Sequence, residues 1–469
     1  MTLDPSDWKD LRAQGHRMLD DMFDYLADIR ERPVWRPMTQ DVRDQFKTNM
    51  PSSPQSLDGI YDEFTKFILP YSSGNVHPGF MGWVQGGGTG VGMLAEMLAA
   101  GLNANLGGRD HAPIAVEQQI TQWLREIFKF PAEASGLFVT GTSLANLIAV
   151  LVARTEAVGK DVRKAGVSNH SKLRAYSSVA AHSCITRALD MAGLGSDALR
   201  LIPIDASHRM DTAALKAAIA ADKKAGLEPF MVIGTAGTVD VGAFDDLAAI
   251  HDICRAENLY FHVDGAYGAL AMLSRELAPR LKGIELADSV ALDFHKWGQV
   301  PYDAGFILVR DGEKHRAAFS APAAYLRRET RGLASGDFWP TDYGPDLSRG
   351  FRALKTWFTL KTYGSEQLGR MMEETCAVAR HLEKKIKAEP HLEILAPVQL
   401  NIVCFRYRAD DKTNAEILAD VQESGIAAPS MTTIDGKRAI RAAIFNHRTR
   451  NEDVDALVEA ILRFGKKRA

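Results

Sequence analysis

The hydrophobic and polar positions of the first 70 residues predict two helices. In the segment 6–30, apolar side chains recur at spacings of three, four or seven, namely at Trp8, Leu11, Met18, Met22, Leu26 and Ile29. This spacing places them on one face of an amphipathic helix, which Pro33 ends. A second helix fits 57–69, before Pro70. Two helices are too few to bury a core of their own, so we expect them to pack on another domain or on a second subunit.

A glycine-rich stretch follows, with the sequence Gln85-Gly-Gly-Gly-Thr-Gly-Val-Gly92. It does not match G-x-G-x-x-G in any register, and no strand is predicted before it, which argues against a dinucleotide site. We therefore interpret it as a loop that leads into a helix over 91–104. A further helix begins at Pro113 and ends before Pro131.

Between residue 136 and about residue 310, short apolar runs alternate with helical stretches. The predicted strands are Leu137–Val139, Ala175–Ala180, Leu199–Pro203, Phe230–Gly234, Tyr260–Asp264, Ser289–Leu292 and Gly305–Val309. Their length, β-branched content and intervening helices indicate an α/β fold with a mainly parallel sheet covered on both faces. In such sheets ligands bind at the carboxyl ends of the strands.

The last third of the chain predicts a smaller α/β unit. Residues 310–350 are irregular, and the tract 327–336 is a candidate lid over a site. A long helix over 351–387 then leads into strands near 392–396, 399–407 and 438–444, with helices near 414–424 and 452–464. We therefore predict three parts: an N-terminal helical segment (1–78), a large α/β domain (79–352) and a small C-terminal α/β domain (353–469).

Composition and charge exclude several classes of function. The 469 residues are 46% hydrophobic and 25% charged, as in ordinary soluble proteins, and the net charge of −3 favours neither nucleic acid nor an anionic membrane as partner. The four cysteines, Cys184, Cys254, Cys376 and Cys404, are far apart, which indicates reduced thiols in a cytoplasmic protein. The acidic start is unlike a signal peptide, and no apolar run approaches the roughly 18 residues of a membrane helix.

The strongest candidate for chemistry is a lysine after a predicted strand, in Asp288-Ser-Val-Ala-Leu-Asp-Phe-His-Lys-Trp297. A lysine amine forms a Schiff base with carbonyl compounds, and pyridoxal phosphate depends on that bond. Taken alone, Lys296 is a weak signal, because most lysines are solvated surface charges. Its meaning depends on whether other residues supply what pyridoxal phosphate needs.

An anion site is predicted in Val139-Thr-Gly-Thr-Ser-Leu-Ala-Asn146, where a strand turns into a helix. The N–H groups at a helix N-terminus, with the hydroxyls of Thr142 and Ser143, suit a phosphate. An ordinary capping turn would have the same pattern. The segment also nearly matches the G-x-S-x-G elbow of serine hydrolases, with Ser143, Asp264 and His295 in triad order. The final glycine is missing, however, and a hydrolase gives Lys296 no role.

Two further strand ends carry residues that suit a flat, nitrogen-containing ring. Asp264 could hold a pyridine nitrogen protonated, and Ala266 would let the ring lie close to the backbone. His182 could stack on the ring, although a lone histidine is more often a packing residue. The thirteen histidines show no H-E-x-x-H or other zinc spacing, and we expect no metal site.

With these motifs the chain resembles the group II pyridoxal-phosphate-dependent amino-acid decarboxylases, most of all the aromatic-L-amino-acid decarboxylases. The resemblance extends from about His77 to about Arg441. It rests on the Thr-Gly-Thr-Ser turn and on Ala181-His182-Ser183, Gly234-Thr-Ala-Gly-Thr238, Gly242-Ala-Phe-Asp-Asp246, His262-Val-Asp-Gly-Ala-Tyr267 and His295-Lys-Trp297. It implies the aspartate-aminotransferase-type fold (fold type I) and a homodimer whose N-terminal helices clamp the partner.

The resemblance also implies roles for individual residues. Lys296 would form the Schiff base, His182 would stack on the ring and Asp264 would hold the pyridine nitrogen, with Ala266 behind the ring. Thr142, Ser143 and His295 match phosphate-site positions, and Thr238 lies beside the cofactor. Two positions depart from the family pattern: Asp293, where asparagine is usual, and Val239, where a second threonine is common.

The substrate is less well defined by the resemblance. The segment His77-Pro-Gly-Phe-Met-Gly-Trp83 is similar to part of the family's substrate pocket, to which we assign His77, Phe80, Trp83, Val84 and Arg349. Arg441 also matches a family arginine, without an assigned role. These positions favour tryptophan, tyrosine, phenylalanine or hydroxylated forms. The more polar stretch 103–109 leaves a smaller or acidic amino acid open.

The expected reaction is decarboxylation of an L-amino acid to the amine and carbon dioxide. Tyr325 resembles the tyrosine of the family's catalytic loop, which returns a proton to the substrate carbon; aldehyde-forming relatives typically have phenylalanine there. Three alternatives stay open: an aldehyde-forming relative, a serine hydrolase that uses Ser143, and a cofactor-binding protein without turnover.

Overall fold

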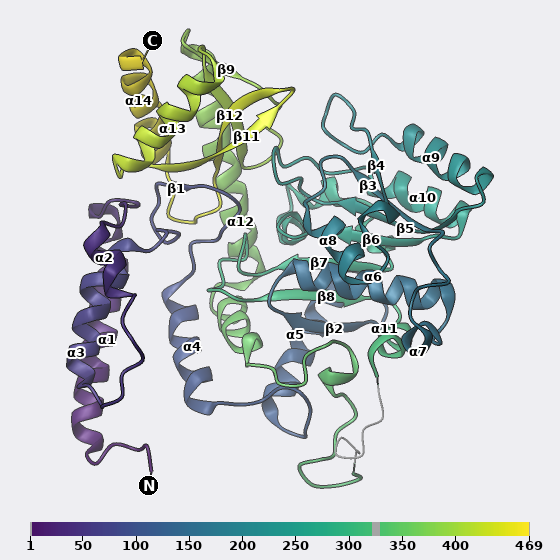
Figure 1. Ribbon diagram of the computed structural model, residues 1–469, viewed down its shortest axis with the longest axis horizontal. Coiled ribbons are helices and arrows are strands. Elements are labelled where there is room, and N and C mark those ends of the chain that lie inside the picture. Colours follow the sequence, from purple (N-terminus) through teal and green to yellow (C-terminus); the bar gives the residue numbers. More distant parts are fainter. Residues whose placement is uncertain (1, 321–328, 469) are drawn as a thin grey trace. The chain divides into compact units, whose positions relative to one another are not determined.

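The computed structural model describes residues 2–320 and 329–468 (Figure 1). The chain divides into two compact units. The larger comprises Val84–Ala379 and Pro397–Ile402, and the smaller comprises Met1–Trp83, Arg380–Ala396 and Val403–Ala469. These borders differ from the predicted ones at 78/79 and 352/353. The helix α12 (Arg352–Ala388) runs on past the second predicted border, and the predicted N-terminal segment shares a unit with most of the C-terminal residues.

A seven-stranded sheet is the centre of the larger unit. Its order is β2 (Ser135–Val139), β8 (Gly305–Val309), β7 (Ser289–Asp293), β6 (Tyr260–Asp264), β5 (Glu228–Thr235), β3 (Leu173–Ser178) and β4 (Leu199–Ile202). Only β8 is antiparallel to its neighbours, and the other strands share one direction. The mainly parallel sheet is therefore confirmed, and six strands have their carboxyl ends at one edge.

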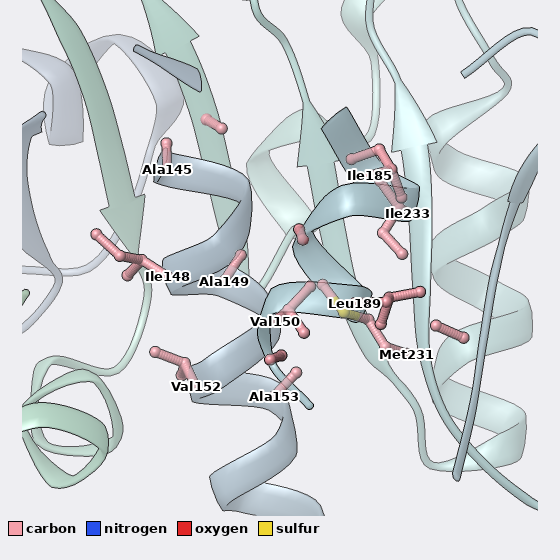
Figure 2. Close-up of a cluster of buried hydrophobic side chains, with 14 of the residues drawn as sticks. Ala145, Ile148, Ala149, Val150, Val152, Ala153, Ile185, Leu189, Met231 and Ile233 are labelled. Carbon is pink, nitrogen blue, oxygen red and sulfur yellow. The ribbon is translucent and has the colours of Figure 1, made fainter. Parts of the chain in front are cut away.

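Helices connect and cover these strands, because most strand residues are buried and the sheet must be covered on both faces. They are α4 (Gly90–Leu102), α5 (Ala112–Phe128), α6 (Thr142–Val158), α7 (Val162–Ala165), α8 (Cys184–Met191), α9 (Thr212–Lys224), α10 (Leu247–Glu257) and α11 (Gly312–Phe319). In Figure 2 small and branched side chains of α6, among them Ala149, Val150 and Ala153, lie on the side of the helix that faces Ile185 and Leu189 of α8 and Ile233 of β5. This core fixes the start of α6 at the carboxyl edge of the sheet.

The smaller unit contains a five-stranded sheet with the order β1 (Phe80–Met81), β11 (Ala428–Ile434), β12 (Lys437–Ala443), β10 (Ile402–Tyr407) and β9 (Leu392–Ile394). Its helices are α1 (Trp8–Ala27), α2 (Gln40–Gln45), α3 (Leu57–Glu63), α13 (Asp411–Glu423) and α14 (Asn451–Arg468). The sequence analysis missed β1 and β11. An available signal was Asp435-Gly436, which joins β11 to β12 with φ of 48° and 77°, as a two-residue hairpin loop requires.

The first helix confirms the predicted amphipathic segment. Asp7 caps α1 by accepting a hydrogen bond from Lys9 N, and none of the helix's residues is buried. Within the described ranges, no helix is both long and apolar enough to cross a membrane.

Candidate active site

The carboxyl ends of the parallel strands carry most of the residues predicted to bind a cofactor. β6 ends at Asp264, and β7 ends at Asp293, three residues before Lys296. His182 follows β3, and Thr238 follows β5. Because these strands run in the same direction, their ends meet at one edge of the sheet, where parallel α/β sheets bind ligands. The structure therefore brings together residues that are up to 114 positions apart, from His182 to Lys296.

Lys296 is in direct contact with a carboxylate. Its Nζ lies 2.8 Å from Oδ2 of Asp293, and its side chain keeps 20% of its surface exposed. Burial lowers the pKa of Lys296, but the charge and hydrogen bond of Asp293, with the charge of Asp264, outweigh burial and raise it. An amine must lose its proton before it attacks a carbonyl, so Asp293 restrains the nucleophile that the sequence predicted.

The glycine-rich loop packs against this lysine segment. Gly86 N donates to the carbonyl of His295 at 3.2 Å. A Cβ on Gly86 would lie 2.2 Å from the carbonyl oxygen of Lys296, so only glycine fits at this position. The loop interpretation was correct, and the close approach of backbone to backbone is the physical reason for this glycine.

Asp293 links the lysine to the start of α6. Thr142 donates its backbone N–H to Oδ1 at 2.8 Å and its hydroxyl to Oδ2 at 2.9 Å. His295 Nδ1 accepts from Ala304 N at 3.0 Å, so in a neutral ring the proton is on Nε2, 3.6 Å from Asp293 Oδ2. Burial lowers the pKa of His295 and favours that neutral form, although the charge of Asp293 opposes it.

The predicted anion turn is partly occupied by these contacts. Both donors of Thr142 bind Asp293, so the interpretation of its hydroxyl as an open phosphate donor needs correction. Ser143 is exposed, and among the described residues neither its hydroxyl nor its amide N–H has a partner. Gly141 precedes the helix and supplies no side-chain cap. The 17-residue helix α6 therefore presents Ser143 at its positive end, where an anion is stabilised.

Asp264 is a buried carboxylate with 4% of its surface exposed. Its Oδ1 accepts from Ala266 N at 3.1 Å, and its Oδ2 accepts from Asn146 Nδ2 at 3.2 Å. Burial raises the pKa of Asp264, and the charge of Lys296 opposes this rise only in part. Ala266 is joined to the next strand end, because its carbonyl accepts from Asp293 N at 2.9 Å.

His182 is at the same edge, with its imidazole exposed. Its Nδ1 accepts from the backbone N–H of Cys184 at 3.2 Å. Partial desolvation lowers the pKa of His182, while the charge of Asp264 raises it and that of Lys296 lowers it. The neutral ring that results can lie against an apolar or aromatic surface.

Thr238 is fully buried and stabilises its own loop. Its Oγ1 accepts from Ala243 N at 2.9 Å, and its carbonyl accepts from Gly242 N at 2.9 Å. These bonds shape the loop after β5, next to the strand end that carries Asp264.

The alternative serine hydrolase triad is not assembled in the described residues. His295 contacts Ala304 and Asp293, and Asp264 is bound to Ala266 and Asn146. Ser143 makes no hydrogen bond to either group, so it has no base to activate its hydroxyl.

The segment predicted to line a substrate pocket is mostly buried in the smaller unit. His77 Nδ1 accepts from Gly79 N at 2.9 Å, and Phe80 packs on Val34 and Ala428. These two side chains have 6% and 4% of their surface exposed, which is typical of core residues. Val84 is also buried, at 9%. Trp83 differs, because its side chain is 58% exposed.

The assignment of Arg349 to the substrate pocket was wrong. Its guanidinium is buried and forms a two-pronged ion pair with Glu117, at 2.7 Å and 3.2 Å. The same two terminal nitrogens donate to the carbonyls of Leu106 and Phe138, at 2.9 Å and 2.7 Å. The arginine therefore joins α5, β2 and the 103–109 segment and has no donor left at either terminal nitrogen for a substrate carboxylate.

Tyr325 lies outside the described residues. Asn146 binds Asp264, Asp293 binds Lys296, and His262 binds Asn146. None of these three residues was predicted as functional. For His262 a signal existed, since strand alternation puts it on the same face as Asp264.

These residues fit pyridoxal phosphate. The exposed Ser143 at the start of α6 suits a phosphate, and the partly exposed Lys296 can reach an aldehyde. The buried Asp264 suits a protonated ring nitrogen, and Ala266 leaves space beside it. This set combines an anion site, an amine and a buried carboxylate, as the cofactor requires.

Comparison with known proteins agrees with this geometry. The sequence model of the pyridoxal-dependent decarboxylase conserved domain matches residues 39–408. An aromatic-L-amino-acid decarboxylase of Bacillus atrophaeus is 30% identical over 459 residues, which cover 95% of this chain and 93% of the relative. A histidine decarboxylase of Mus musculus is 31% identical and covers 94% of this chain and 68% of the relative.

Solved structures share the fold over almost the whole chain. The crystal structure of Oryza sativa TDC with PLP and tryptamine superposes with a TM-score of 0.91, covers 99% of both chains and is 24% identical. The Rhodiola rosea 4-hydroxyphenylacetaldehyde synthase superposes with a TM-score of 0.88 at 25% identity and also covers 99% of both chains. The predicted fold type I is confirmed. The chain belongs to the pyridoxal-dependent decarboxylase family and is a pyridoxal-phosphate-dependent amino-acid decarboxylase.

Proposed function

We propose that this enzyme decarboxylates an aromatic L-amino acid, namely tryptophan, tyrosine, phenylalanine or a hydroxylated form, to the amine and carbon dioxide. The observation that carries the substrate class is the exposed indole of Trp83. An exposed tryptophan of this kind offers a large, flat surface for another aromatic ring. Relatives with the names aromatic-L-amino-acid decarboxylase and tryptophan decarboxylase support the same class.

The chain holds Trp83 in a fixed orientation. Its φ is 49°, a conformation that non-glycine residues rarely adopt, and its ring stacks on Phe80 with centroids 6.2 Å apart. Trp83 N donates to Ser430 Oγ at 3.3 Å, and Arg441 Nη1 donates to the carbonyl of Trp83 at 3.1 Å. Arg441 therefore supports the tryptophan, and we assign it this role in place of binding a carboxylate.

The polar stretch 103–109 had left a smaller or acidic substrate open. Asn105 Oδ1 accepts from the backbone N–H groups of Gly107 and Arg349, each at 3.0 Å. The guanidinium of Arg109 lies over the ring of Trp339, 5.0 Å from the centroid. Because these polar groups serve the chain's own structure, the stretch gives little support to an acidic substrate.

Each of the residues at the sheet edge has a separate proposed role. Bound pyridoxal phosphate supplies an electron sink for the bond between the α-carbon and the carboxylate. Lys296 would hold the cofactor covalently, Ser143 and His295 would bind its phosphate, and Asp264 would hold the proton of its ring nitrogen. His182 would stack on the ring, and Asp293 would hold the proton of the Lys296 amine until that amine reacts. Tyr325 is proposed as the proton donor to the substrate carbon on the resemblance alone.

We also propose a homodimer that covers the apolar side of α1 and α3. These helices are side by side in Figure 1, and Tyr61 donates to Asp21 at 2.7 Å between them. Exposed apolar side chains remain on both, at Trp8, Leu11, Phe23, Leu57 and Ile60. Soluble proteins rarely leave such a surface in water, so a second copy is its expected partner. Sedimentation should give twice the chain mass, and the double change Trp8→Asp, Leu11→Asp should give monomers, unlike Met191→Asp on α8.

A cytoplasmic location is part of the proposal. Its support is that Cys184, Cys254, Cys376 and Cys404 are buried and form no disulfide in the described parts of the chain. Fractionation of the producing cells would test it, and recovery of the protein outside the cytoplasm would contradict it.

The central experiment combines cofactor attachment with turnover. The purified protein should be yellow, and borohydride should fix pyridoxal phosphate to Lys296, as peptide mass spectrometry would show. Carbon dioxide release should be fastest with an aromatic member of a panel of tryptophan, tyrosine, phenylalanine, histidine and glutamate. Trp83→Ala should raise the KM for that substrate, whereas Phe46→Ala, at an equally exposed aromatic residue, should not.

Other results would favour the alternatives. Fastest turnover of glutamate or histidine would overturn the aromatic proposal. Aldehyde and hydrogen peroxide in place of amine would identify an aldehyde-forming enzyme. A yellow protein that releases no carbon dioxide would contradict turnover, and labelling of Ser143 by a fluorophosphonate would revive the hydrolase.

A further inference from the structure

A buried chain of hydrogen bonds leads away from Asp264 into the sheet. Asn146 Nδ2 donates to Asp264 Oδ2 at 3.2 Å, and Asn146 Oδ1 lies 2.8 Å from His262 Nε2. His262 Nδ1 lies 2.7 Å from Ser289 Oγ. The exposed fraction of Asn146, His262 and Ser289 is 0%, so water does not compete for these bonds.

Three elements of the larger unit hold this chain in place. His262 and Asp264 are two residues apart on β6 and therefore share a face. Ser289 opens β7 and pairs in register with His262. Asn146 is the fifth residue of α6, one turn after the predicted anion site. This series of hydrogen bonds thus joins the start of α6 to the strand end that carries Asp264.

Donor and acceptor chemistry fixes the direction of every bond. An ionised carboxylate only accepts, so Asn146 must turn its NH₂ toward Asp264 and its carbonyl toward His262. His262 Nε2 must then carry the ring proton. Burial lowers the pKa of His262 to about 3, so the ring holds a single proton and its Nδ1 accepts from the hydroxyl of Ser289. Each donor therefore points along the chain toward Asp264.

We propose that Asn146 and His262 are positioning residues that orient Asp264 and keep it ionised for the pyridine nitrogen of the cofactor. This inference rests on the proposed function, in which Asp264 faces that nitrogen. A cation in place of Asn146 would neutralise the carboxylate, whereas a neutral amide stabilises the anion and leaves its charge available to the ring. The nearby ammonium of Lys296 is in direct contact with Asp293 instead.

Paired variants test this role. Asn146→Asp replaces the donor by an acceptor, His262→Leu removes the second link, and His262→Gln keeps an N–H of similar reach. The controls are Asn414→Asp, at an equally buried amide of the smaller unit, and His315→Leu, at a buried histidine bound to Ser135 at 2.8 Å. The controls match the loss of a buried polar group without touching Asp264.

The first readouts are the dissociation constant of pyridoxal phosphate and the pH dependence of the bound cofactor's visible spectrum. Asn146→Asp and His262→Leu should weaken binding about tenfold, as expected for a lost charge-assisted hydrogen bond, and should shift the spectral transition. His262→Gln should restore most of the affinity. Both controls should lower the melting temperature and leave the affinity unchanged. If Asn146→Asp bound pyridoxal phosphate as tightly as the wild-type protein and its spectrum were unchanged, the proposal would be overturned.

A measurement on the natural sequence needs no variant to fold. Nitrogen-15 NMR of histidine-labelled protein, freed of cofactor, should give His262 as a neutral ring with its proton on Nε2 at pH 7. A proton on Nδ1, or a protonated ring, would overturn the proposed direction. If borohydride fixes no cofactor on Lys296 of the natural protein, the proposed function itself fails. If it does, and the variants bind as tightly, only the positioning role fails.

Discussion

The larger unit contains two buried histidine–serine pairs that are nearly identical in their local chemistry. His262 Nδ1 lies 2.7 Å from Ser289 Oγ, and His315 Nδ1 lies 2.8 Å from Ser135 Oγ. Both rings have an exposed fraction of 0%, and burial lowers the pKa of each to about 3. Each histidine is therefore a neutral ring that is hydrogen-bonded to a buried hydroxyl.

The two pairs differ in what lies beyond the ring. His262 continues to Asn146 and from there to Asp264. His315 packs edge-on against Phe319 and Tyr343, with centroids 5.9 Å and 5.2 Å apart. The difference shows that burial and a lowered pKa do not distinguish a residue that serves the site from one that serves packing. The connection to a functional group distinguishes them.

The largest expected effect on catalysis is at Asp264, where the hydrogen bonds from His262 and Asn146 end. Asp264→Asn removes the anion and should lower kcat by roughly a thousandfold, which is about 4 kcal/mol in the activation barrier. Asp222, which binds Tyr176 at 2.8 Å, offers a control because it is a buried carboxylate with a different partner. Steady-state kinetics should show nearly unchanged kcat in Asp222→Asn. Comparable loss in both variants would mean that the effect is structural.

Arg349 extends the comparison to a charged buried pair. Arg349→Leu leaves Glu117 buried without its cation, which should cost about 3–5 kcal/mol in the free energy of unfolding. Urea unfolding would measure this loss. In protein that remains folded at low temperature, the KM should stay close to the natural value, because the guanidinium binds only the chain itself. A selective rise in KM would restore the predicted role in the substrate pocket.

Sequence reasoning was most accurate where one element decides the outcome. β6 and β8 were predicted with their observed bounds, because a short apolar run between turns suffices to define a buried strand. β1 has only two residues, and β11 carries Pro429 and polar residues, so neither gives a periodic signal. Their pairing partners, and not their own sequence, make them strands.

The prediction of site residues was likewise most accurate where a single element defines the position. Lys296 and Asp264 were predicted because each is next to a recognisable strand end. Arg349 was misassigned because its partner Glu117 is 232 positions away and no spacing indicates a buried ion pair at that separation. Asn146 was missed because its role depends on α6, β6 and β7 meeting. Buried polar networks of this kind are visible only once the elements are packed.

The pH dependence of stability tests what the two histidines share. Each has its pKa lowered from 6.5 to about 3, so between these values the unfolded chain binds a proton that the folded chain does not. The contribution of the two histidines to the free energy of unfolding is therefore complete above pH 6.5. Below that pH it falls by about 1.4 kcal/mol per pH unit for each histidine. Urea unfolding at pH 7.5, 6 and 5 should show a smaller fall in both His262→Phe and His315→Phe. An unchanged fall in either would contradict the neutral ring.

Asp293 offers a contrast to Asn146. The neutral amide of Asn146 contacts Asp264, whereas the charged carboxylate of Asp293 contacts Lys296. Asp293→Asn removes the main cause that raises the pKa of Lys296, so more of the amine is neutral at pH 7.5. Cofactor-free protein should therefore capture pyridoxal phosphate several-fold faster, as followed by absorbance. The gain should vanish at high pH, where the natural amine is also neutral. Slower capture at every pH would mean that Asp293 chiefly positions Lys296.

The smallest effect separates the pairs most cleanly. Ser289→Ala and Ser135→Ala each remove one hydroxyl that is hydrogen-bonded to a buried Nδ1, so each should cost about 1 kcal/mol of stability. Only Ser289→Ala should also weaken pyridoxal phosphate binding, by a few-fold, because only its histidine leads to Asp264. Thermal melting should show a similar loss of stability in both variants. Cofactor titration should show weaker binding in Ser289→Ala and unchanged binding in Ser135→Ala. If Ser135→Ala weakened cofactor binding as much, the chain from Ser289 to Asp264 would have no special role, and the two histidines would be equivalent packing residues.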